Sequence, residues 1–300
     1  MNGVLYIANP CYLSIKDANI IVSTEKDGAT RVPINDVSVV VLENNYSSMS
    51  SAFMSHLAEK NIVLFTCDRS FMPNGIFLPF HQHSRYTEVS NQQLEWSEPF
   101  KKSIWKKIVT NKVQNQIDLL EYFEFNTFEM KPYVSKIKSG DTGNVEAIVA
   151  SYYWNIIFSN SLYYYTRNMD EIRNSALNYG YAILRSAVAR GLVASGFTPF
   201  FGLHHKNKLN SFNLVDDLME VFRCVIDKEV YMMFEEEGLA DEVLSKEIKR
   251  RLISLLESIF IIENKKYTLL SAIGVYVDSL KRATKNRDSN LLVKVVLDGE

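Results

Sequence analysis

Val37-Ser38-Val39-Val40-Val41-Leu42-Glu43 is a short run dominated by valine, and a run of this kind predicts a β-strand. Similar runs rich in valine and isoleucine lie on both sides of it, at residues 3–8, 19–24, 29–34, 61–67 and 76–80. Pro73-Asn74-Gly75 predicts a tight turn before the last of these runs. One helix is predicted at residues 47–61, where serines offer an N-cap. Residues 1–80 are therefore expected to be mostly β.

The pattern changes after this region. Residues 86–97 are polar and are expected to be a linker. Further on, apolar residues recur near the helical period of 3.6, and helices are predicted at residues 103–123, 145–158, 174–196, 214–234 and 245–260. The charged tail from about residue 281 is expected to fray. The fold class is α+β, with a small β-rich domain at 1–85, a linker at 86–97 and a larger all-α domain at 98–300.

The composition narrows the class of protein. The chain has 300 residues, 33 basic and 35 acidic, so any DNA-binding surface must be a local basic patch. Its three cysteines, Cys11, Cys67 and Cys224, are far apart, which argues against a disulfide framework and a zinc knuckle.

The first residues do not resemble a signal peptide and no apolar run is long enough to span a bilayer, so we expect a cytoplasmic protein without membrane contact. The motifs of P-loop NTPases and of α/β-hydrolases are missing.

A cluster of acidic residues stands in an otherwise apolar helical stretch. Asp217 and Asp216 lie three and four residues before Glu220, and like charges at these spacings repel by about 0.2–0.5 kcal/mol per pair. A helix that keeps such a cluster is a candidate for holding a cation. The alternative is a solvated acidic helix start, stabilised by the helix dipole.

Two other segments carry candidate ligands. The loop Gly202–Lys208 contains His204, His205, Lys206 and Lys208, so that an imidazole ligand would lie beside phosphate-binding cations, unless it is an ordinary polar loop. Glu146 stands among small and apolar residues, either as an exposed helix-start charge or as a buried functional carboxylate. Two carboxylates and one imidazole form a donor set that suits Mg²⁺ or Mn²⁺ and metal-assisted phosphoryl transfer.

Two further clusters have both a functional and a structural explanation. Five lysines with a tryptophan among them predict either a DNA-backbone track or a solvated helix face: Lys101, Lys102, Trp105, Lys106, Lys107 and Lys112. Tyr163-Tyr164-Tyr165 is better explained by packing than by a covalent tyrosine nucleophile, because consecutive helical residues do not share a face.

Four motifs in order resemble the CRISPR-associated spacer-acquisition integrase family, and most closely its type II branch: Asn144–Ala147, Arg173–Leu184, Gly202–His205 and Asp217–Arg223. Similar residues occur earlier in the chain, at Cys67-Asp68, Pro73-Asn74-Gly75, Leu78-Pro79-Phe80, Trp105, Lys112, Asn115 and Gln116. The resemblance covers roughly residues 1–280. Its small departures are Ala147 in place of a common glycine and Cys224 in place of a proline, and neither concerns a ligand.

The resemblance implies a reaction and a set of site residues. A free 3′-hydroxyl of a short DNA fragment would attack a phosphodiester at the edge of a CRISPR repeat, with Mg²⁺ or Mn²⁺ held by Glu146, His205 and Glu220. Asp217 and His204 would support these ligands. Candidates for phosphate contacts are Lys206, Lys208, Arg223, Arg185 and Arg190, although Arg185 and Arg190 could equally pack against neighbouring helices.

The resemblance also implies partners. They are double-stranded DNA, a second copy of the chain bound through the β-rich domain, and a small adaptation protein in a heterohexamer of two integrase dimers and one partner dimer. The type II branch adds an RNA-guided nuclease and a ring-shaped accessory protein. Two alternatives stay open, a catalytically inert DNA-binding scaffold and a metal-dependent nuclease for branched DNA that shares the same site.

Overall fold

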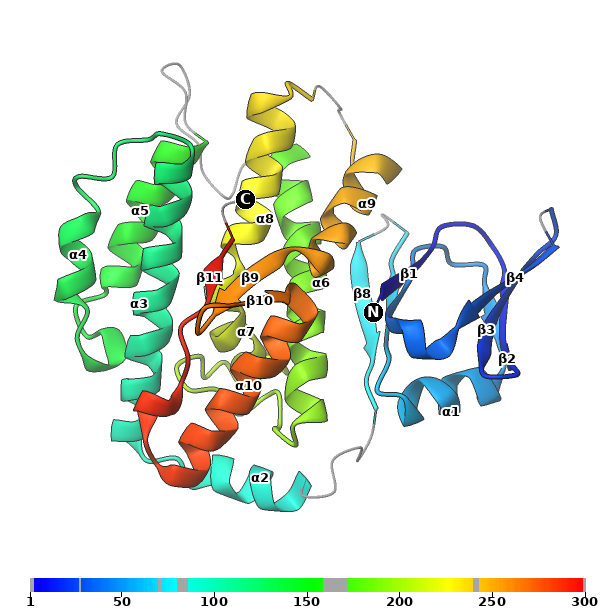
Figure 1. The fold of residues 1–300 in the computed structure, drawn as a ribbon, viewed down its shortest axis with the longest axis horizontal. Coiled ribbons are helices and arrows are strands. Elements are labelled where there is room, and N and C mark those ends of the chain that lie inside the picture. Colours follow the sequence, from blue (N-terminus) through cyan, green and yellow to red (C-terminus); the bar gives the residue numbers. More distant parts are fainter. Residues whose placement is uncertain are drawn as a thin grey trace.

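A computed structural model describes residues 3–26, 28–69, 72–79, 86–158, 172–239 and 243–298. A smaller β-rich part, drawn in blue in Figure 1, is followed by a larger and mainly helical part, which confirms the predicted α+β class. The β-rich part consists of β1 (Gly3–Ile7), β2 (Tyr12–Lys16), β3 (Asn19–Thr24), β4 (Gly28–Pro33), β5 (Val37–Leu42), β6 (Ser48–Met49), α1 (Ser51–Glu59), β7 (Val63–Cys67) and β8 (Pro73–Phe77). Of these, β2 and β6 were not predicted.

Strand β5 lies inside a four-stranded sheet of order β1-β5-β7-β8, in which β8 alone is antiparallel to its neighbour. Side chains alternate between the two faces of a strand. Val39 and Val41 pack into the main hydrophobic cluster of the helical part, whereas Val40 and Leu42 pack into a second cluster with α1 and the other sheet, of order β4-β3-β2-β6. Burial on both faces explains why the run is almost entirely apolar.

The predicted turn at Pro73-Asn74-Gly75 is wrong, because these residues begin the edge strand β8. Proline is tolerated at the first residue of an edge strand, where its missing N–H interrupts no central ladder. Gly75 faces Thr66 on β7, and a Cβ at position 75 would lie 2.3 Å from the Thr66 Oγ1. The glycine therefore serves a close approach between two strands.

The helical part contains α2 (Tyr86–Leu94), α3 (Glu98–Tyr122), α4 (Lys131–Lys136), α5 (Val145–Ile157), α6 (Ile172–Ala194), α7 (Asn213–Met219), α8 (Cys224–Tyr231), α9 (Lys246–Ser254) and α10 (Leu269–Asn286). The helices predicted at 103–123, 145–158 and 174–196 are confirmed as α3, α5 and α6. The single helix predicted at 214–234 is instead divided by a 3-10 turn at Glu220–Phe222 and ends in a π-helical segment, Met232–Glu236.

The segment expected to be a linker is mostly the helix α2. Gln93 of α2 is buried, and its side-chain amide donates to the carbonyl oxygens of Thr198 and Phe201 at 2.9 Å each. Its Oε1 accepts a hydrogen bond from the Thr198 N–H, also at 2.9 Å. This connection therefore anchors the start of the loop that carries the two histidines.

Two expectations for the C-terminal region were wrong. The helical part also contains a three-stranded sheet of order β10-β9-β11, made of β9 (Ile259–Ile262), β10 (Lys265–Thr268) and β11 (Val296–Leu297). The tail does not fray within the described residues, since α10 continues to Asn286 and β11 pairs with β9. The Asn111 side chain of α3 fixes the tail by bonding both the carbonyl and the N–H of the buried Val295, at 2.6 and 2.8 Å.

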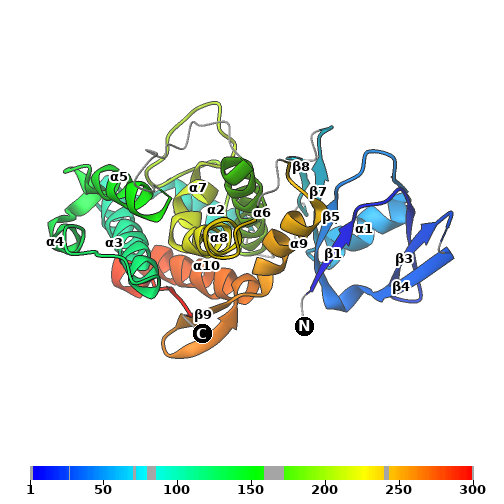
Figure 2. The ribbon, with the colours of Figure 1, turned by 90° about the horizontal axis from the view of Figure 1, so that it is seen from above.

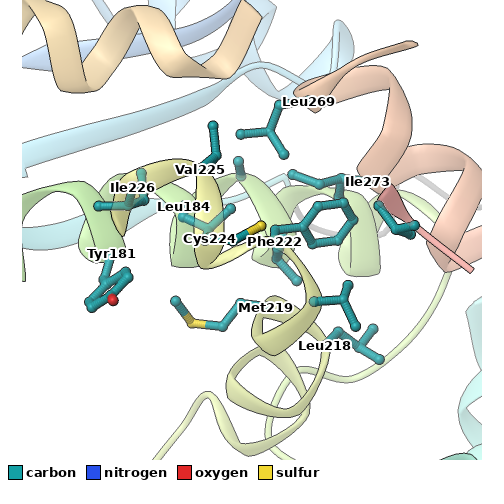
Figure 3. Close-up of a cluster of buried hydrophobic side chains, with 14 of the residues drawn as sticks. Tyr181, Leu184, Leu218, Met219, Phe222, Cys224, Val225, Ile226, Leu269 and Ile273 are labelled. Carbon is teal, nitrogen blue, oxygen red and sulfur yellow. The ribbon is translucent and has the colours of Figure 1, made fainter. Parts of the chain in front are cut away.

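The core of the helical part lies where α6, α8 and α10 meet. Figure 3 shows Leu184, Phe222, Val225 and Ile273 packed together there. Gly180 of α6 is part of this contact, because a Cβ at position 180 would lie 2.5 Å from the Ile226 Cγ2. The glycine lets α6 and α8 approach closely.

We therefore expect Gly180→Ala to lower the free energy of unfolding by about 1–3 kcal/mol through overpacking, despite the better helix propensity of alanine. Gly274→Ala in α10 is the matched control, because a Cβ there meets no atom within 4 Å. That variant should gain about 0.5–1 kcal/mol. Urea denaturation of both proteins measures the difference, and equal effects would contradict the close-packing explanation.

Buried polar contacts join the β-rich part to the helices, which lie side by side in Figure 2. Lys249 of α9 donates to Glu43 Oε1 at 2.6 Å, Tyr6 donates to the other oxygen of Glu43, and both Lys249 and Glu43 are buried. Arg190 of α6 donates to the Asn61 carbonyl at 2.8 Å. In the described ranges, no helix is long and apolar enough to cross a membrane.

Candidate active site

Glu146 is positioned by the first turn of α5. The carboxylate of Asp141 accepts hydrogen bonds from the backbone N–H groups of Val145 and Glu146, at 2.9 Å each, and so satisfies two donors of the helix start. The Glu146 side chain is partly exposed and forms an ion pair with Lys112 of α3. Glu146 thus points from the start of α5 toward the middle of α3.

Glu220 lies on the 3-10 turn between α7 and α8, and its side chain is only 7% exposed. Arg223 Nη2 is 3.0 Å from Glu220 Oε1, and Lys112 Nζ is 2.6 Å from Oε2. The contact with Lys112 lacks the alignment of a hydrogen bond, so Glu220 Oε2 is a buried oxygen without a hydrogen-bond donor. Lys112 therefore lies between the carboxylates of Glu146 and Glu220.

The charges in this group stabilise one another. Burial opposes the charge of Lys112, but Glu220 and Glu146 outweigh this effect and raise the pKa of Lys112. Burial likewise disfavours the charged form of Glu220, but Arg223 and Lys112 outweigh it and lower the pKa of Glu220. Both groups are therefore charged at neutral pH.

Asp217 is fully buried, and its carboxylate supports the histidine loop, Gly202–Lys208. Its Oδ2 accepts hydrogen bonds from the N–H groups of Leu203 and His204, at 2.6 and 3.1 Å. Its Oδ1 accepts from the His205 N–H at 3.2 Å and pairs with His205 Nδ1 at 2.7 Å. Because a carboxylate only accepts, Nδ1 carries the proton and the Nε2 lone pair of a neutral ring is left for another partner.

The two histidines have different surroundings. The ring of His204 stacks on Trp105 of α3, with centroids 4.3 Å apart and an interplanar angle of 2°, while His205 meets the same tryptophan edge-on. The hydrogen bond to Asp217 raises the pKa of His205, whereas partial burial lowers the pKa of His204. Asp217 therefore orients the ring of His205 but not the ring of His204.

The acidic cluster is neither a solvated helix start nor a single cation site. Asp216 accepts two hydrogen bonds from Arg185, at 2.7 and 2.8 Å, on the outer side of α7. Asp217 faces the histidine loop, and Glu220 faces Lys112. Each carboxylate of the predicted cluster therefore has its own partner.

The five candidate phosphate contacts are distributed differently. Lys206 and Lys208 are exposed on the histidine loop, and Arg223 faces Glu220. Arg185 is held by Asp216 and Asn210, and Arg190 by the carbonyl of Asn61. These contacts favour the packing alternative for Arg185 and Arg190.

The basic helix face on α3 is smaller than its sequence suggested. Lys112 is buried in the site and Trp105 is buried beneath His204, so neither lies on an exposed track. Lys101 pairs with Glu98, which leaves Lys102 and Lys106 as exposed members. Tyr163-Tyr164-Tyr165 lies outside the described residues.

A polar cavity of about 280 Å³ opens beside the two glutamates. Charged and polar side chains of α3, α5, α6, α8 and the turn before α8 line it, among them Lys112, Glu146, Tyr181, Glu220, Arg223 and Asp227. Asp227 is buried and accepts hydrogen bonds from the hydroxyls of Tyr153, at 2.8 Å, and Tyr181. His205 lines another pocket, of about 510 Å³, together with Lys206 and Lys208.

The donor set fits Mg²⁺ or Mn²⁺, since it offers two carboxylates, one with a buried oxygen that lacks a hydrogen bond, and an imidazole oriented by a carboxylate. In this arrangement, no three His, Cys, Asp or Glu side chains of the described residues lie close enough together to hold a metal ion. Lys112 instead supplies the positive charge between Glu146 and Glu220.

Several contributors to the site escaped sequence reasoning. Asp141 precedes the start of α5 by four residues, which is a capping signal that could have been found. Other contributors join segments that are far apart in the sequence, namely the ion pairs of Lys112 and the hydrogen bonds of two tyrosines to Asp227. No local sequence pattern predicts such contacts.

Known proteins resemble this chain along most of its length. The family model for "CRISPR associated protein Cas1" matches residues 5–257. A curated relative, "CRISPR-associated endonuclease Cas1" of Neisseria meningitidis serogroup C (strain 8013), is 35% identical over 290 residues, which is 96% of this chain and 94% of the relative.

Solved structures also share the fold, and two of them serve as examples. A chain of a "Cas6-RT-Cas1--Cas2 complex" superposes with a TM-score of 0.76 and 20% identity over 100% of this chain, which spans only 36% of that longer chain. A "Casposase bound to integration product" gives a TM-score of 0.74 and 17% identity over 95% of this chain and 91% of that chain. At these identities the likeness concerns the fold alone.

Proposed function

This chain belongs to the CRISPR-associated Cas1 family, and from that premise we propose that it is a metal-dependent DNA integrase of CRISPR adaptation. The observation that carries the proposal is the convergence of Glu146 and Glu220 on one buried ammonium beside a polar cavity. These carboxylates lie 74 positions apart in the sequence. Packing alone would not require two such distant side chains to meet. The family model and the curated relative confirm the resemblance of the sequence motifs to this family.

We propose that Glu146, Glu220 and His205 hold Mg²⁺ or Mn²⁺. When bound, the ion would polarise the scissile phosphate and stabilise the leaving oxygen. Asp217 keeps the His205 ring in the tautomer whose Nε2 is free to bind, and it fixes the loop backbone through three N–H groups. Arg223 balances the charge of Glu220 from the side opposite Lys112.

The proposed reaction is a transesterification. The 3′-hydroxyl oxygen of a short DNA fragment forms a new bond to a repeat phosphorus as the phosphorus releases a 3′-oxygen, and the hydroxyl proton passes to that leaving oxygen or to solvent. One phosphodiester is lost as another forms, so no nucleotide cofactor is needed. Lys206 and Lys208, which are exposed beside His205, are proposed to contact the DNA backbone.

The partners are part of the proposal. We propose a homodimer formed through the β-rich domain (1–85), with catalysis in the helical domain (98–300). One of the solved structures with this fold is a complex of Cas1 with Cas2, which supports a small adaptation partner for this chain. The heterohexamer, the RNA-guided nuclease and the ring-shaped accessory protein rest on the type II resemblance. The second candidate reaction is hydrolysis at the same site, since the curated relative is named an endonuclease.

Strand transfer tests the proposal. The protein and its small partner are mixed with a labelled short duplex, a supercoiled plasmid that carries a repeat, and Mg²⁺ or Mn²⁺. We expect the wild type to join label to plasmid only with metal, and His205→Ala to lose joining by roughly a hundredfold or more. His56→Ala, which changes a half-buried histidine on α1 far from the site in sequence, is the matched control and should join normally.

The other outcomes separate the alternatives. Cleaved plasmid without joined label would favour a nuclease. A wild type that binds DNA but neither joins nor cuts with any divalent metal would favour the inert scaffold. Equal joining by His205→Ala and the wild type would remove His205 from the site.

A further inference from the structure

Lys112 is the feature of the site that the proposed reaction does not use. Its side chain is only 11% exposed, and it reaches from the middle of α3 to two carboxylates on other elements. The Nζ atom lies 2.6 Å from Glu220 Oε2 and forms an ion pair with Glu146 Oε1. A primary ammonium is a compact point charge that can take the place of a small cation between oxygen ligands.

The four side chains in contact carry balanced charges, two negative on Glu146 and Glu220 and two positive on Lys112 and Arg223. The buried carboxylate of Asp227 lines the same cavity. A divalent ion held by both glutamates would lie close to two side-chain cations in a largely buried site, where charge repulsion is weakly screened. Because Lys112 lies between the two glutamates, its ammonium must move away before an ion can contact both.

Lys112, and not Arg223, is the cation that prevents a metal ion from contacting both glutamates. It contacts both glutamates, whereas Arg223 contacts only Glu220 and lies over the ring of Tyr181 on its other side, 4.7 Å from the centroid. The lysine side chain has four rotatable methylene groups and can swing toward the cavity that it lines.

We propose that the Lys112 ammonium occupies the cation position between Glu146 and Glu220 in the metal-free protein and is displaced when a divalent ion binds. Lys112 then keeps the empty site folded and sets the concentration of Mg²⁺ or Mn²⁺ at which the site fills. A competitor of this kind lowers the apparent affinity for the metal by the free energy of the contacts that must be broken. The inference rests on the proposed metal site.

The test measures Mn²⁺ binding to the full-length protein without DNA, from the electron paramagnetic resonance signal of free Mn²⁺. Lys112→Met removes the charge at similar length, and we expect it to bind Mn²⁺ roughly tenfold more tightly than the wild type. Lys112→Arg keeps the charge and should not bind more tightly. Lys107→Met on the same helix is the matched control and should bind like the wild type, and Glu220→Gln reports binding at this site.

Each outcome decides the inference. Binding that depends on Glu220 but is equal or weaker in Lys112→Met would overturn the role of Lys112 and leave the metal site standing. A lack of Glu220-dependent binding in all of these proteins would overturn both. Tighter binding by Lys112→Met alone would support both.

A second measurement uses the wild type and does not depend on the folding of a variant. Amine labelling followed by peptide mass spectrometry reports the reactivity of Lys112, with Lys107 as the internal reference. We expect the labelling of Lys112 to rise several-fold when Mn²⁺ replaces EDTA, because the amine leaves its two carboxylates. Unchanged or lower labelling, in a protein that binds Mn²⁺, would overturn the displacement.

Discussion

Replacing Glu220 with glutamine is expected to reduce strand transfer by roughly three orders of magnitude, in Mg²⁺ and in Mn²⁺ alike. The substitution keeps the shape of the side chain but removes a charge that lies buried between two cations. Lys112 is 2.6 Å from one oxygen of Glu220, and Arg223 is 3.0 Å from the other. A neutral amide would be a poor ligand for a hard divalent ion, which prefers charged oxygens.

The measurement is the yield of joined label per unit time under single-turnover conditions. Glu129→Gln, an exposed change of the same chemistry, should join at the wild-type rate. Glu220→Gln also removes one of the negative charges that face Lys112 and Arg223, which can destabilise the fold. The thermal stability of the variant must therefore be measured as well. The double variant Glu220→Gln with Lys112→Met restores the charge balance and should remain inactive. Joining within tenfold of the wild type by Glu220→Gln would remove Glu220 from the proposed ligand set.

Replacing Asp217 with alanine is expected to lower both stability and activity. The substitution leaves three backbone N–H groups and the His205 ring without their acceptor. Removal of one partner from buried, charge-assisted bonds of this kind costs about 3–5 kcal/mol. Strand transfer should fall by roughly a hundredfold or more, since the loop that carries His205 loses its support and the ring loses its fixed tautomer.

Urea denaturation and strand transfer measure the two effects separately. Asp216→Ala is the neighbouring control, because it removes a partly buried carboxylate that accepts from Arg185 and Asn210 and should cost about 1–2 kcal/mol, less than Asp217→Ala. Asp217→Asn keeps one acceptor oxygen and should fall between the wild type and Asp217→Ala. A stable Asp217→Ala protein with full activity would show that the histidine loop does not depend on this carboxylate.

Local sequence patterns predicted those elements that have a clear signature, either a continuous apolar run for a strand buried on both faces or the helical period of apolar residues. The valine run of β5 and the helical period of α3 were both readable in this way. Failures occurred where contacts with distant residues override the local pattern. The apolar residues after Ser254 continue a helical pattern, yet Ile259–Ile262 forms β9 because β10 and β11 pair with it on both sides. The polar α2 is helical where Gln93 can bond the loop near Thr198.

The site was predictable to the extent that residue types reveal chemistry. Motif resemblance proposes Glu146, His205 and Glu220 as ligands, and the structure brings Glu146 and Glu220 to one ammonium. The role of Lys112 was not predictable, because its sequence neighbours Lys106 and Lys107 suggest a surface face. The helices that pack around α3 determine which lysine of the cluster is buried. Their arrangement cannot be derived from local patterns in a single sequence.

The packing of β5 has a consequence for how the molecule loses its structure. One row of β5 side chains belongs to the main cluster of the helices and the other to the cluster of the β-rich part, and Glu43 just beyond the strand is neutralised by Lys249 of α9. If either part unfolds, apolar surface of the other part becomes exposed. The buried Glu43–Lys249 pair is also broken, which leaves one of its charges without a partner. Heating should therefore give one calorimetric transition for the whole chain, with equal van't Hoff and calorimetric enthalpies. A fragment that ends at the boundary near residue 85 should aggregate, since its valine-rich strand would offer one bare apolar face to water.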